Sequence, residues 1–451
     1  MNRCLFFLCL LVIMGEAYSR KKRAQDQCVC SNTESCKHPK KDLGINQEIY
    51  GFTYESTKVE LWSWDTLTTL IVPSSFNPSN RSHYNTKCVA HDKGRKFGFT
   101  VDFNLSGSIN STSTDAISWS SLAFKKWEEW NAEVMVVNLL PYFHSDNSST
   151  KEDHMVLVQI LHNLKSQMIQ AQNITITLAC ILPWKPPCTE DDETCYFTSH
   201  AADVCDVIIL NPDSFTDLDG AKCRARATIP FSKLFYSISD YNSHHVANNR
   251  IILGVPWHGY DYKCSEAPKN DICTPVLGET CLLSERERLT YGDIVSNFSA
   301  HYAKHDFSEM YMAPYFTYNA GAEYHQVWFE DDRSLVAKYR LVKEFQLRGI
   351  ALMYGDDLSP HTSINILNND LFMWSWLSHE LLLHKSQQSS NGIQCAETVA
   401  GAAVGCLLLG TLLGVTFTCL ALRNKVRKPK APFSRDRNGA VEEFVDEDPN
   451  L

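Results

Sequence analysis

The stretch Glu133-Val134-Met135-Val136-Val137-Asn138-Leu139-Leu140 decides the fold. A short run that is apolar at nearly every position, rather than at alternate positions, is typical of a strand buried on both faces of a parallel sheet. Amphipathic stretches lie on either side of it, at Ser118–Trp130 and Lys151–Ala171. The sequence therefore predicts a buried strand between two helices, which is the repeating unit of α/β proteins.

Seven further runs of this kind lie between residues 45 and 380 and are rich in Val, Ile and Phe. Eight alternations of strand and helix fit a (β/α)8 barrel, although an open doubly wound sheet has the same periodicity. No Gly-x-Gly-x-x-Gly motif follows an early strand, so a dinucleotide-binding fold is not indicated. The seven runs are Glu48–Thr53, Leu67–Val72, Lys96–Phe103, Ile174–Leu182, Val204–Asn211, Arg250–Pro256 and Gly349–Tyr354.

The composition is that of a globular protein, with 44% hydrophobic and 21% charged residues among 451. The net charge of −10 argues against a nucleic-acid partner, which requires a basic surface. Residues 1–19 predict a secretory signal, because Arg3 precedes the apolar run Cys4–Met14 and Ala17-Tyr18-Ser19 fits the cleavage pattern.

Residues 398–422 carry no charge and are long enough to span a bilayer, and basic residues follow at once. This order predicts a type I protein in the plasma membrane or another membrane of the secretory pathway. We expect a Cys-rich segment at 20–44, a barrel at 45–380, a stalk at 381–397 and a cytoplasmic tail at 423–451. Small residues four apart in the span suggest a homodimer contact; they are Gly401, Gly405, Gly410 and Gly414.

Thirteen cysteines lie outside the signal and the span, and a secreted chain is expected to pair most of them in disulfides. Because thirteen is odd, one is free or bridges two chains, and Cys395 is the candidate. The candidates for disulfides are Cys28, Cys30, Cys36, Cys88, Cys180, Cys188, Cys195, Cys205, Cys223, Cys264, Cys273 and Cys281. Six sequons predict glycosylation of several asparagines; they begin at Asn80, Asn104, Asn110, Asn147, Asn173 and Asn297.

Six features of the sequence are long strings or cysteine spacings that are rare in composition: Val255–Cys264, Ala313–Tyr315, Tyr324–Trp328, Leu347–Ile350, the Cys195-Tyr196…Cys205-Asp206 spacing and the N-terminal Cys28-x-Cys30-x5-Cys36. Together they resemble the chitobiase-like members of glycoside hydrolase family 18. The resemblance covers most of residues 28–380 and is strongest in 250–350, and it implies the barrel that the strand count only allows. The soluble family member has no counterpart of the span and tail.

The resemblance implies a substrate-assisted cleavage of N-acetylglucosamine linkages, in which one Glu protonates the leaving oxygen and an Asp two residues earlier supports it. Leu140 stands at the position of that proton donor and Asn138 at the position of its partner. Glu133 keeps a carboxylate at the first position of the motif. Leucine has no proton to give, so the resemblance predicts a lost general acid.

Two more elements of the implied site are altered. The tyrosine that the family uses to hold the acetamide is replaced by Pro212, while Asp213 is kept. The tryptophan expected beneath the sugar is replaced by Met353. Three changed elements favour a lost activity, with no catalytic residue assigned.

Other acids and histidines offer weaker alternatives. Asp146, Asp356 and Asp357 follow predicted strands, and we expect them to be solvated loop residues, with Glu133 structural. Neither His244-His245 nor His301…His305 has an acidic or Cys partner at a fixed offset, so no metal and no cofactor are predicted. Aromatic residues form either a sugar-stacking surface or ordinary core. The candidates for ligand binding are Asp213, Trp257, Tyr260, Asp261, Tyr262, Tyr315, Trp328 and Met353.

The sequence thus predicts an inactive, chitobiase-like type I membrane glycoprotein that acts as a receptor, an adhesion protein or a module binding a glycan or a cell-surface protein. The alternative is a membrane-anchored glycosidase with a rebuilt site that hydrolyses oligosaccharides containing N-acetylglucosamine. A purely structural glycoprotein is the third class.

Overall fold

The computed structural model of the protein describes ten segments of the chain. The predicted signal, span and tail, and also Asp146, Pro212 and Asp213, lie outside them. Within the described segments no helix combines the length and the apolar character needed to cross a membrane. The segments are 47–56, 59–105, 114–143, 150–171, 176–188, 195–211, 225–269, 273–274, 286–358 and 373–381.

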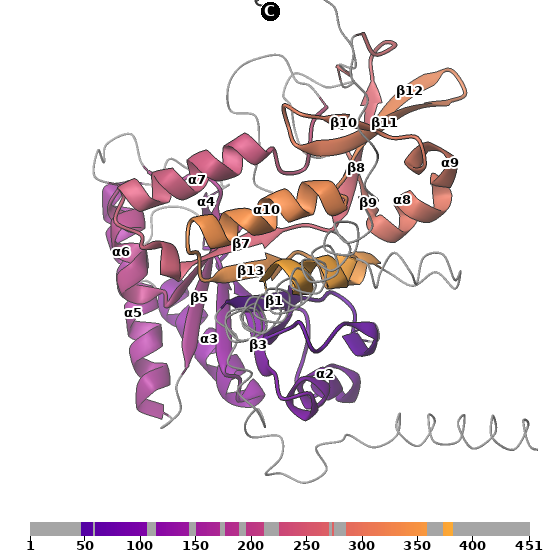
Figure 1. The fold of residues 1–451 in the computed structure, drawn as a ribbon. Helices are drawn as coiled ribbons and strands as arrows, with labels where there is room; N and C mark the ends of the chain where they lie inside the picture. Colours follow the sequence, from indigo (N-terminus) through magenta and orange to yellow (C-terminus); the bar gives the residue numbers. More distant parts are fainter. Residues whose placement is uncertain are drawn as a thin grey trace, which may run out of the picture. The chain divides into compact units, whose positions relative to one another are not determined.

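Eight parallel strands close into a barrel in the order β1-β13-β7-β6-β5-β4-β3-β2, and β1 pairs with β2 to complete the ring (Figure 1). All eight predicted strands are confirmed, and the open doubly wound sheet is excluded. The strands are β1 Glu48–Phe52, β2 Thr69–Val72, β3 Lys96–Asp102, β4 Val134–Asn138, β5 Thr177–Pro183, β6 Val207–Asn211, β7 Ile251–Val255 and β13 Gly349–Leu352.

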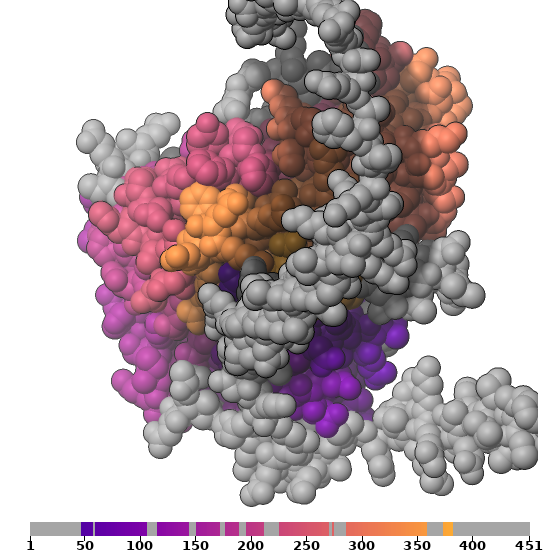
Figure 2. All heavy atoms as spheres, in the orientation of Figure 1, coloured from indigo at the N-terminus to yellow at the C-terminus, as the bar shows by residue number. Residues whose placement is uncertain are grey.

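Helices connect these strands and cover the barrel from outside. The two predicted amphipathic helices are confirmed as α3 and α5. In the orientation of Figure 1, α7 and α10 lie side by side, and Figure 2 shows them as adjoining parts of one surface. The elements are η1 Val59–Leu61, α2 Arg81–Asp92, α3 Thr114–Trp130, α4 Leu140–Phe143, α5 Lys151–Ala171, α6 Tyr196–Val204, α7 Phe231–Ser243, η3 Asn248–Arg250, α10 Asp332–Glu344 and η5 Gly355–Leu358.

A second, antiparallel sheet is inserted between β7 and β13, in the order β10-β11-β12-β8-β9. The sequence analysis did not predict this sheet, because the aromatic residues of its strands were interpreted as candidates for a sugar-binding site. Its elements are β8 His258–Cys264, β9 Glu287–Thr290, α8 Tyr291–Asn297, α9 Ser299–Tyr302, β10 Asp306–Ser308, β11 Ala313–Ala320 and β12 Glu323–Trp328.

The core has an inner and an outer layer. Inside the barrel, side chains from different strands form an apolar cluster that includes Tyr50, Val136, Ile209 and Met353. A larger cluster fills the space between the strands and the helices. Alternate residues of one strand serve the two layers, as in β4, where Val136 faces inward and Val137 outward. This arrangement explains why the strands read as continuous apolar runs.

Every cysteine in the described segments is disulfide-bonded, as predicted for a secreted chain. Cys88 is also bonded, and its partner lies outside these segments. The three complete disulfides are Cys180–Cys205, Cys188–Cys195 and Cys264–Cys273. Three of the six sequon asparagines are described, and all three are exposed: Asn80, Asn104 and Asn297.

Candidate functional site

The polar end of β4 is held by its neighbour β3. Asn138 Nδ2 donates to Asp102 Oδ1 at 2.9 Å, and Asn138 Oδ1 accepts from the backbone N–H of Leu140 at 3.2 Å. Ser74 Oγ donates to Asp102 Oδ2 at 2.5 Å. Asp102 is therefore the carboxylate in direct contact with Asn138 at the end of β4. The sequence analysis missed it, although it ends a predicted strand, the usual position of functional residues in this fold.

Leu140 begins α4 and is half-buried. Its side chain packs against the inner cluster, as does that of Tyr354, and Met353 belongs to the same cluster. Leu140 and Met353, two positions at which the resemblance predicts a replacement, thus lie at one apolar end of the barrel interior. A side chain of this kind contributes packing but no proton.

Glu133 lies at the opposite end of β4 from Asn138, five residues and about 16 Å away along the strand. It is 8% exposed, accepts from the backbone N–H of Phe97 at 3.0 Å and contacts His91 Nε2 at 3.0 Å. These contacts are those of a structural carboxylate that joins β4 to its neighbours. Glu133 is therefore not placed to act at the mouth of the barrel.

The expectation that Asp356 and Asp357 are solvated is wrong. They lie in η5, directly after β13, and are 1% and 0% exposed. Asp356 Oδ2 accepts from Thr53 Oγ1 at 2.7 Å and from the backbone N–H of Tyr54 at 2.6 Å. The sequence could not reveal this burial, because the donors come from the other end of the chain.

Asp357 and His258, both 0% exposed, form an ionic cluster with Arg288, which remains exposed to solvent. Arg288 donates to its two oxygens at 2.7 and 2.6 Å, and His258 Nδ1 lies 3.3 Å from Oδ2. Burial by itself raises the pKa of Asp357, but the hydrogen bond to His258 and the charges of His258 and Arg288 outweigh it and hold the pKa below its usual value. The cluster ties β8 and β9 of the inserted sheet to the last turn of the barrel.

We expect Asp357→Asn to lower the free energy of unfolding at pH 7 by about 1.5–3 kcal/mol, the range for hydrogen bonds to a charged group. A carboxyl whose pKa is lowered by folding contributes stability above its unfolded pKa of about 3.9, and this contribution is lost as the pH falls through the folded value. Urea unfolding at pH 7 and pH 3 should therefore show a difference from wild type that shrinks at pH 3. The exposed Asp115→Asn is the control, and an equal deficit at both pH values would contradict this account.

The aromatic candidates are packed as core. Trp257 is 1% exposed, belongs to the outer layer and donates from Nε1 to Tyr339 Oη at 3.1 Å. Tyr315 stacks on Trp328 at 4.6 Å between ring centroids, and they are 8% and 3% exposed. Tyr260 and Tyr262 belong to the same cluster as this pair. Little ring surface remains for stacking on a sugar.

Asp261 points to the other face of the inserted sheet. Its carboxylate accepts from Tyr318 Oη at 2.5 Å and lies 3.1 Å from His325 Nδ1. Because side chains alternate along β8, Asp261 and Tyr260 lie on opposite faces of the inserted sheet.

The sequence analysis missed two arginines, Arg288 on β9 and Arg286 directly before it. Arg288 lies opposite Tyr260 in the ladder of β8 and β9, and Arg286 lies two residues earlier on the same face. The guanidinium of Arg286 lies over the Tyr260 ring, 3.4 Å from its centroid, and donates to Tyr262 Oη at 3.4 Å. No carboxylate contact of Arg286 is found within the described segments. The spacing Arg286-x-Arg288 indicates two side chains on one face of a strand, but only once residues 287–290 are known to form one.

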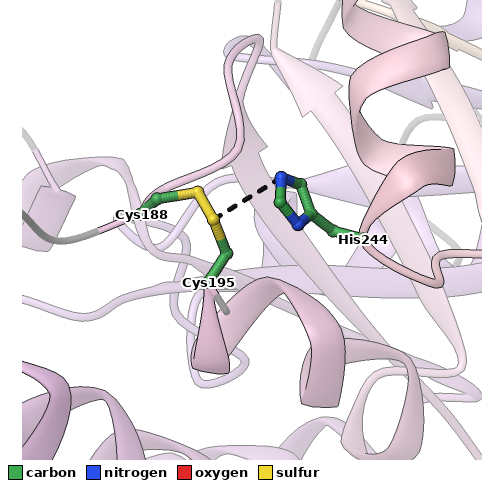
Figure 3. A group of neighbouring side chains, drawn as sticks. All are labelled: Cys188, Cys195 and His244. Atoms are coloured by element: carbon green, nitrogen blue, oxygen red, sulfur yellow. Dashed lines mark hydrogen bonds between the residues drawn. A yellow bond between two sulfur atoms is a disulfide. The ribbon is translucent and has the colours of Figure 1, made fainter. Parts of the chain in front are cut away.

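The structure brings His244 to two cysteines, which the sequence spacing did not predict (Figure 3). Cys188, Cys195 and His244 are the one group of three candidate metal ligands found in the described part of the chain. The two sulfurs are bonded to each other, so neither is the thiolate that a metal requires. His305 instead lies 3.6 Å from Asp331, and His301 stacks on Phe316.

The closed barrel, with polar residues where its strands end and a sheet inserted before the last strand, defines a (β/α)8 protein of the kind that places its site at the carboxyl ends of the strands. The chain belongs to the glycosyl hydrolases family 18, whose family model matches residues 126–353. Di-N-acetylchitobiase of Mus musculus is 25% identical over 343 residues, covering 73% of this chain and 88% of the mouse protein. Di-N-acetylchitobiase of Homo sapiens is 22% identical, covering 80% and 90%.

Solved structures agree on the fold. The class V chitinase from Nicotiana tobaccum aligns with a TM-score of 0.54 at 13% identity, covering 73% of this chain and 99% of the chitinase. A chitinase from Rhizomucor miehei aligns with a TM-score of 0.58 at 14% identity, covering 72% and 100%. At these identities the likeness concerns the fold alone.

Proposed function

We propose that this chain is a family 18 member without hydrolase activity that serves as a ligand-binding module on a membrane. The observation that carries the proposal is Leu140, which stands at the proton-donor position and packs against the apolar interior of the barrel. Its neighbour Asn138 is engaged with Asp102. Protonation of the leaving oxygen contributes about 10²–10⁴-fold to such reactions, and neither side chain supplies a proton.

The competing proposal is a membrane-anchored glycosidase with a rebuilt site. The relatives named di-N-acetylchitobiase are enzymes by their names, which favours this alternative. Asp102 is the acid to test for it, because it contacts Asn138 and is half-exposed.

The binding role rests on Arg286. A guanidinium has five N–H donors in a planar fork, and Arg286 uses one of them in the described structure, on Tyr262. The remaining donors suit a ligand that carries hydroxyl or anionic oxygens, such as a glycan or an acidic segment of a cell-surface protein.

We expect purified residues 20–397 to bind a glycan array or intact cells, and Arg286→Gln to weaken that binding about tenfold, the effect of losing charge-assisted hydrogen bonds. Lys263→Gln is the matched control, since Lys263 is an exposed cation on the same sheet that pairs with Glu323. Binding to neither glycans nor cells would favour a purely structural glycoprotein. An equal loss of binding in both variants would show that Arg286 does not belong to the binding site.

The predicted signal at 1–19 and span at 398–422 support a type I orientation, with the barrel outside the cytoplasm and a homodimer contact at the glycines of the span. We expect the full chain to remain in the membrane fraction after carbonate extraction and to shift in mass with a peptide N-glycosidase. A chain ending at residue 397 should be secreted. Retention of that shortened chain in the membrane would contradict the assignment of the span.

A further inference from the structure

The disulfide between Cys188 and Cys195 joins an exposed residue to a buried one. Cys188 lies in the segment after β5 and is exposed, whereas Cys195 precedes α6 and is 5% exposed. An external thiol therefore has access to this bond from the Cys188 side. The other two complete disulfides have buried residues at both ends: Cys180 0%, Cys205 0%, Cys264 5% and Cys273 0% exposed.

His244 stands beside the buried sulfur. Its Nε2 lies 3.5 Å from Cys195 Sγ, as Figure 3 shows, and 3.8 Å from Asp240 Oδ1. An imidazole beside a sulfur atom stabilises the thiolate that forms there. A disulfide opens faster when the sulfur that leaves is the better-stabilised thiolate. Cys195 is therefore the better leaving group of the two.

The start of α6 acts in the same direction. Cys195 is the N-cap of this nine-residue helix and forms no side-chain hydrogen bond to it. The N–H groups of a first helical turn place a partial positive charge at this end, which also stabilises a thiolate. The electrostatic surroundings favour Cys195 as the leaving thiolate, and the exposure of Cys188 favours attack at Cys188, so both indicate the same direction of exchange.

We propose that Cys188–Cys195 is a surface site of thiol–disulfide exchange that forms a mixed disulfide through Cys188. The sulfur of an external thiolate attacks Cys188 Sγ, the bond between Cys188 and Cys195 breaks, and its electron pair leaves on Cys195 Sγ beside His244. The new bond joins Cys188 to the incoming sulfur. Attack by the Cys195 thiolate reverses the step, so the external thiol is the one co-reactant required. The inference is independent of the altered hydrolase motif.

The test exposes the full chain in detergent to reduced glutathione, quenches with N-ethylmaleimide and maps each cysteine by mass spectrometry. We expect glutathione on Cys188 and alkylation on Cys195, with exchange at least about tenfold faster than at the two buried disulfides. A reduced thioredoxin variant with one active-site cysteine is the second probe. Reaction with one probe alone identifies a small thiol or a protein cysteine as the partner. No exchange with either probe, or glutathione on Cys195, would overturn the proposal.

The exchange rate of a His244 variant tests the role of this histidine separately. His244→Gln should slow the exchange roughly three- to tenfold, because the leaving thiolate loses the imidazole that lies beside it. A merely structural histidine predicts the opposite sign, since its loss would loosen the segment and speed the reaction. His245→Asn is the matched control, because His245 is exposed and its φ of 67° suits asparagine. An unchanged or faster rate in His244→Gln would exclude the assigned role.

Discussion

Purified residues 20–397 should release the fluorophore from a fluorogenic chitobioside about 10²–10⁴-fold more slowly than mouse di-N-acetylchitobiase, the usual contribution of general acid catalysis. The reason is the residue type at the end of β4. The cleaved bond leaves an alkoxide-like oxygen that must be protonated, and Leu140 presents an aliphatic side chain there. The assay compares the two proteins at equal concentration and at several pH values.

Asp102→Asn decides between the two proposals. If the chain is inactive, this variant leaves the residual turnover unchanged, because Asp102 then serves only to hold Asn138 and Ser74. If Asp102 is the acid of a rebuilt site, the variant loses about 10²-fold or more. The control is Asp65→Asn, since Asp65 is exposed and precedes β2. Turnover comparable to that of the chitobiase, lost in Asp102→Asn, would establish the enzyme instead.

Lys338→Met should lower the free energy of unfolding by about 3–5 kcal/mol, the cost of leaving one charge of a buried pair without its partner. Lys338 Nζ donates to Glu330 Oε2, and both side chains are 0% exposed. Ser334 Oγ also donates to this oxygen, at 2.6 Å. Burial raises the pKa of Glu330, and the charge of Lys338 and its hydrogen bond oppose this effect. Chemical denaturation at pH 7 measures the effect.

An exposed pair supplies the matched control. Lys263 and Glu323 form an ion pair on the inserted sheet, with side chains 45% and 51% exposed. Lys263→Met should change stability far less than Lys338→Met, because water solvates both charges. The double variant Glu330→Gln/Lys338→Met should recover most of the loss, since it removes both buried charges. A similar loss in Lys338→Met and Lys263→Met would show that burial does not govern the pair.

The barrel could be predicted because each of its strands is buried on both faces. In β4, Val136 faces the interior and Val137 the helices, so both positions must be apolar. That requirement acts on neighbouring residues of one strand and is therefore visible in a single sequence. The placement of Asn138 and Leu140 at the end of β4 could be predicted for the same reason, because a short segment determines where a strand ends.

The inserted sheet could not be predicted in this way. Its partners along β12 and β8 are about 60 residues apart, as in the pair Gln326 and Tyr262, and pairing at that range leaves no local period. The burial of Asp357 likewise depends on Arg288 and His258, which come from distant strands. Charged and aromatic residues in such a sheet resemble surface or site residues until their contacts are known.

The sequence by itself determined the eight barrel strands and placed the aliphatic Leu140 directly after β4, because burial on two faces and residue identity are set along one short segment. The tertiary structure alone decided which charges are buried, which aromatic rings are covered and which sulfur stands beside His244. Those properties depend on contacts between segments that are far apart in the sequence, and such contacts exist only in the folded chain.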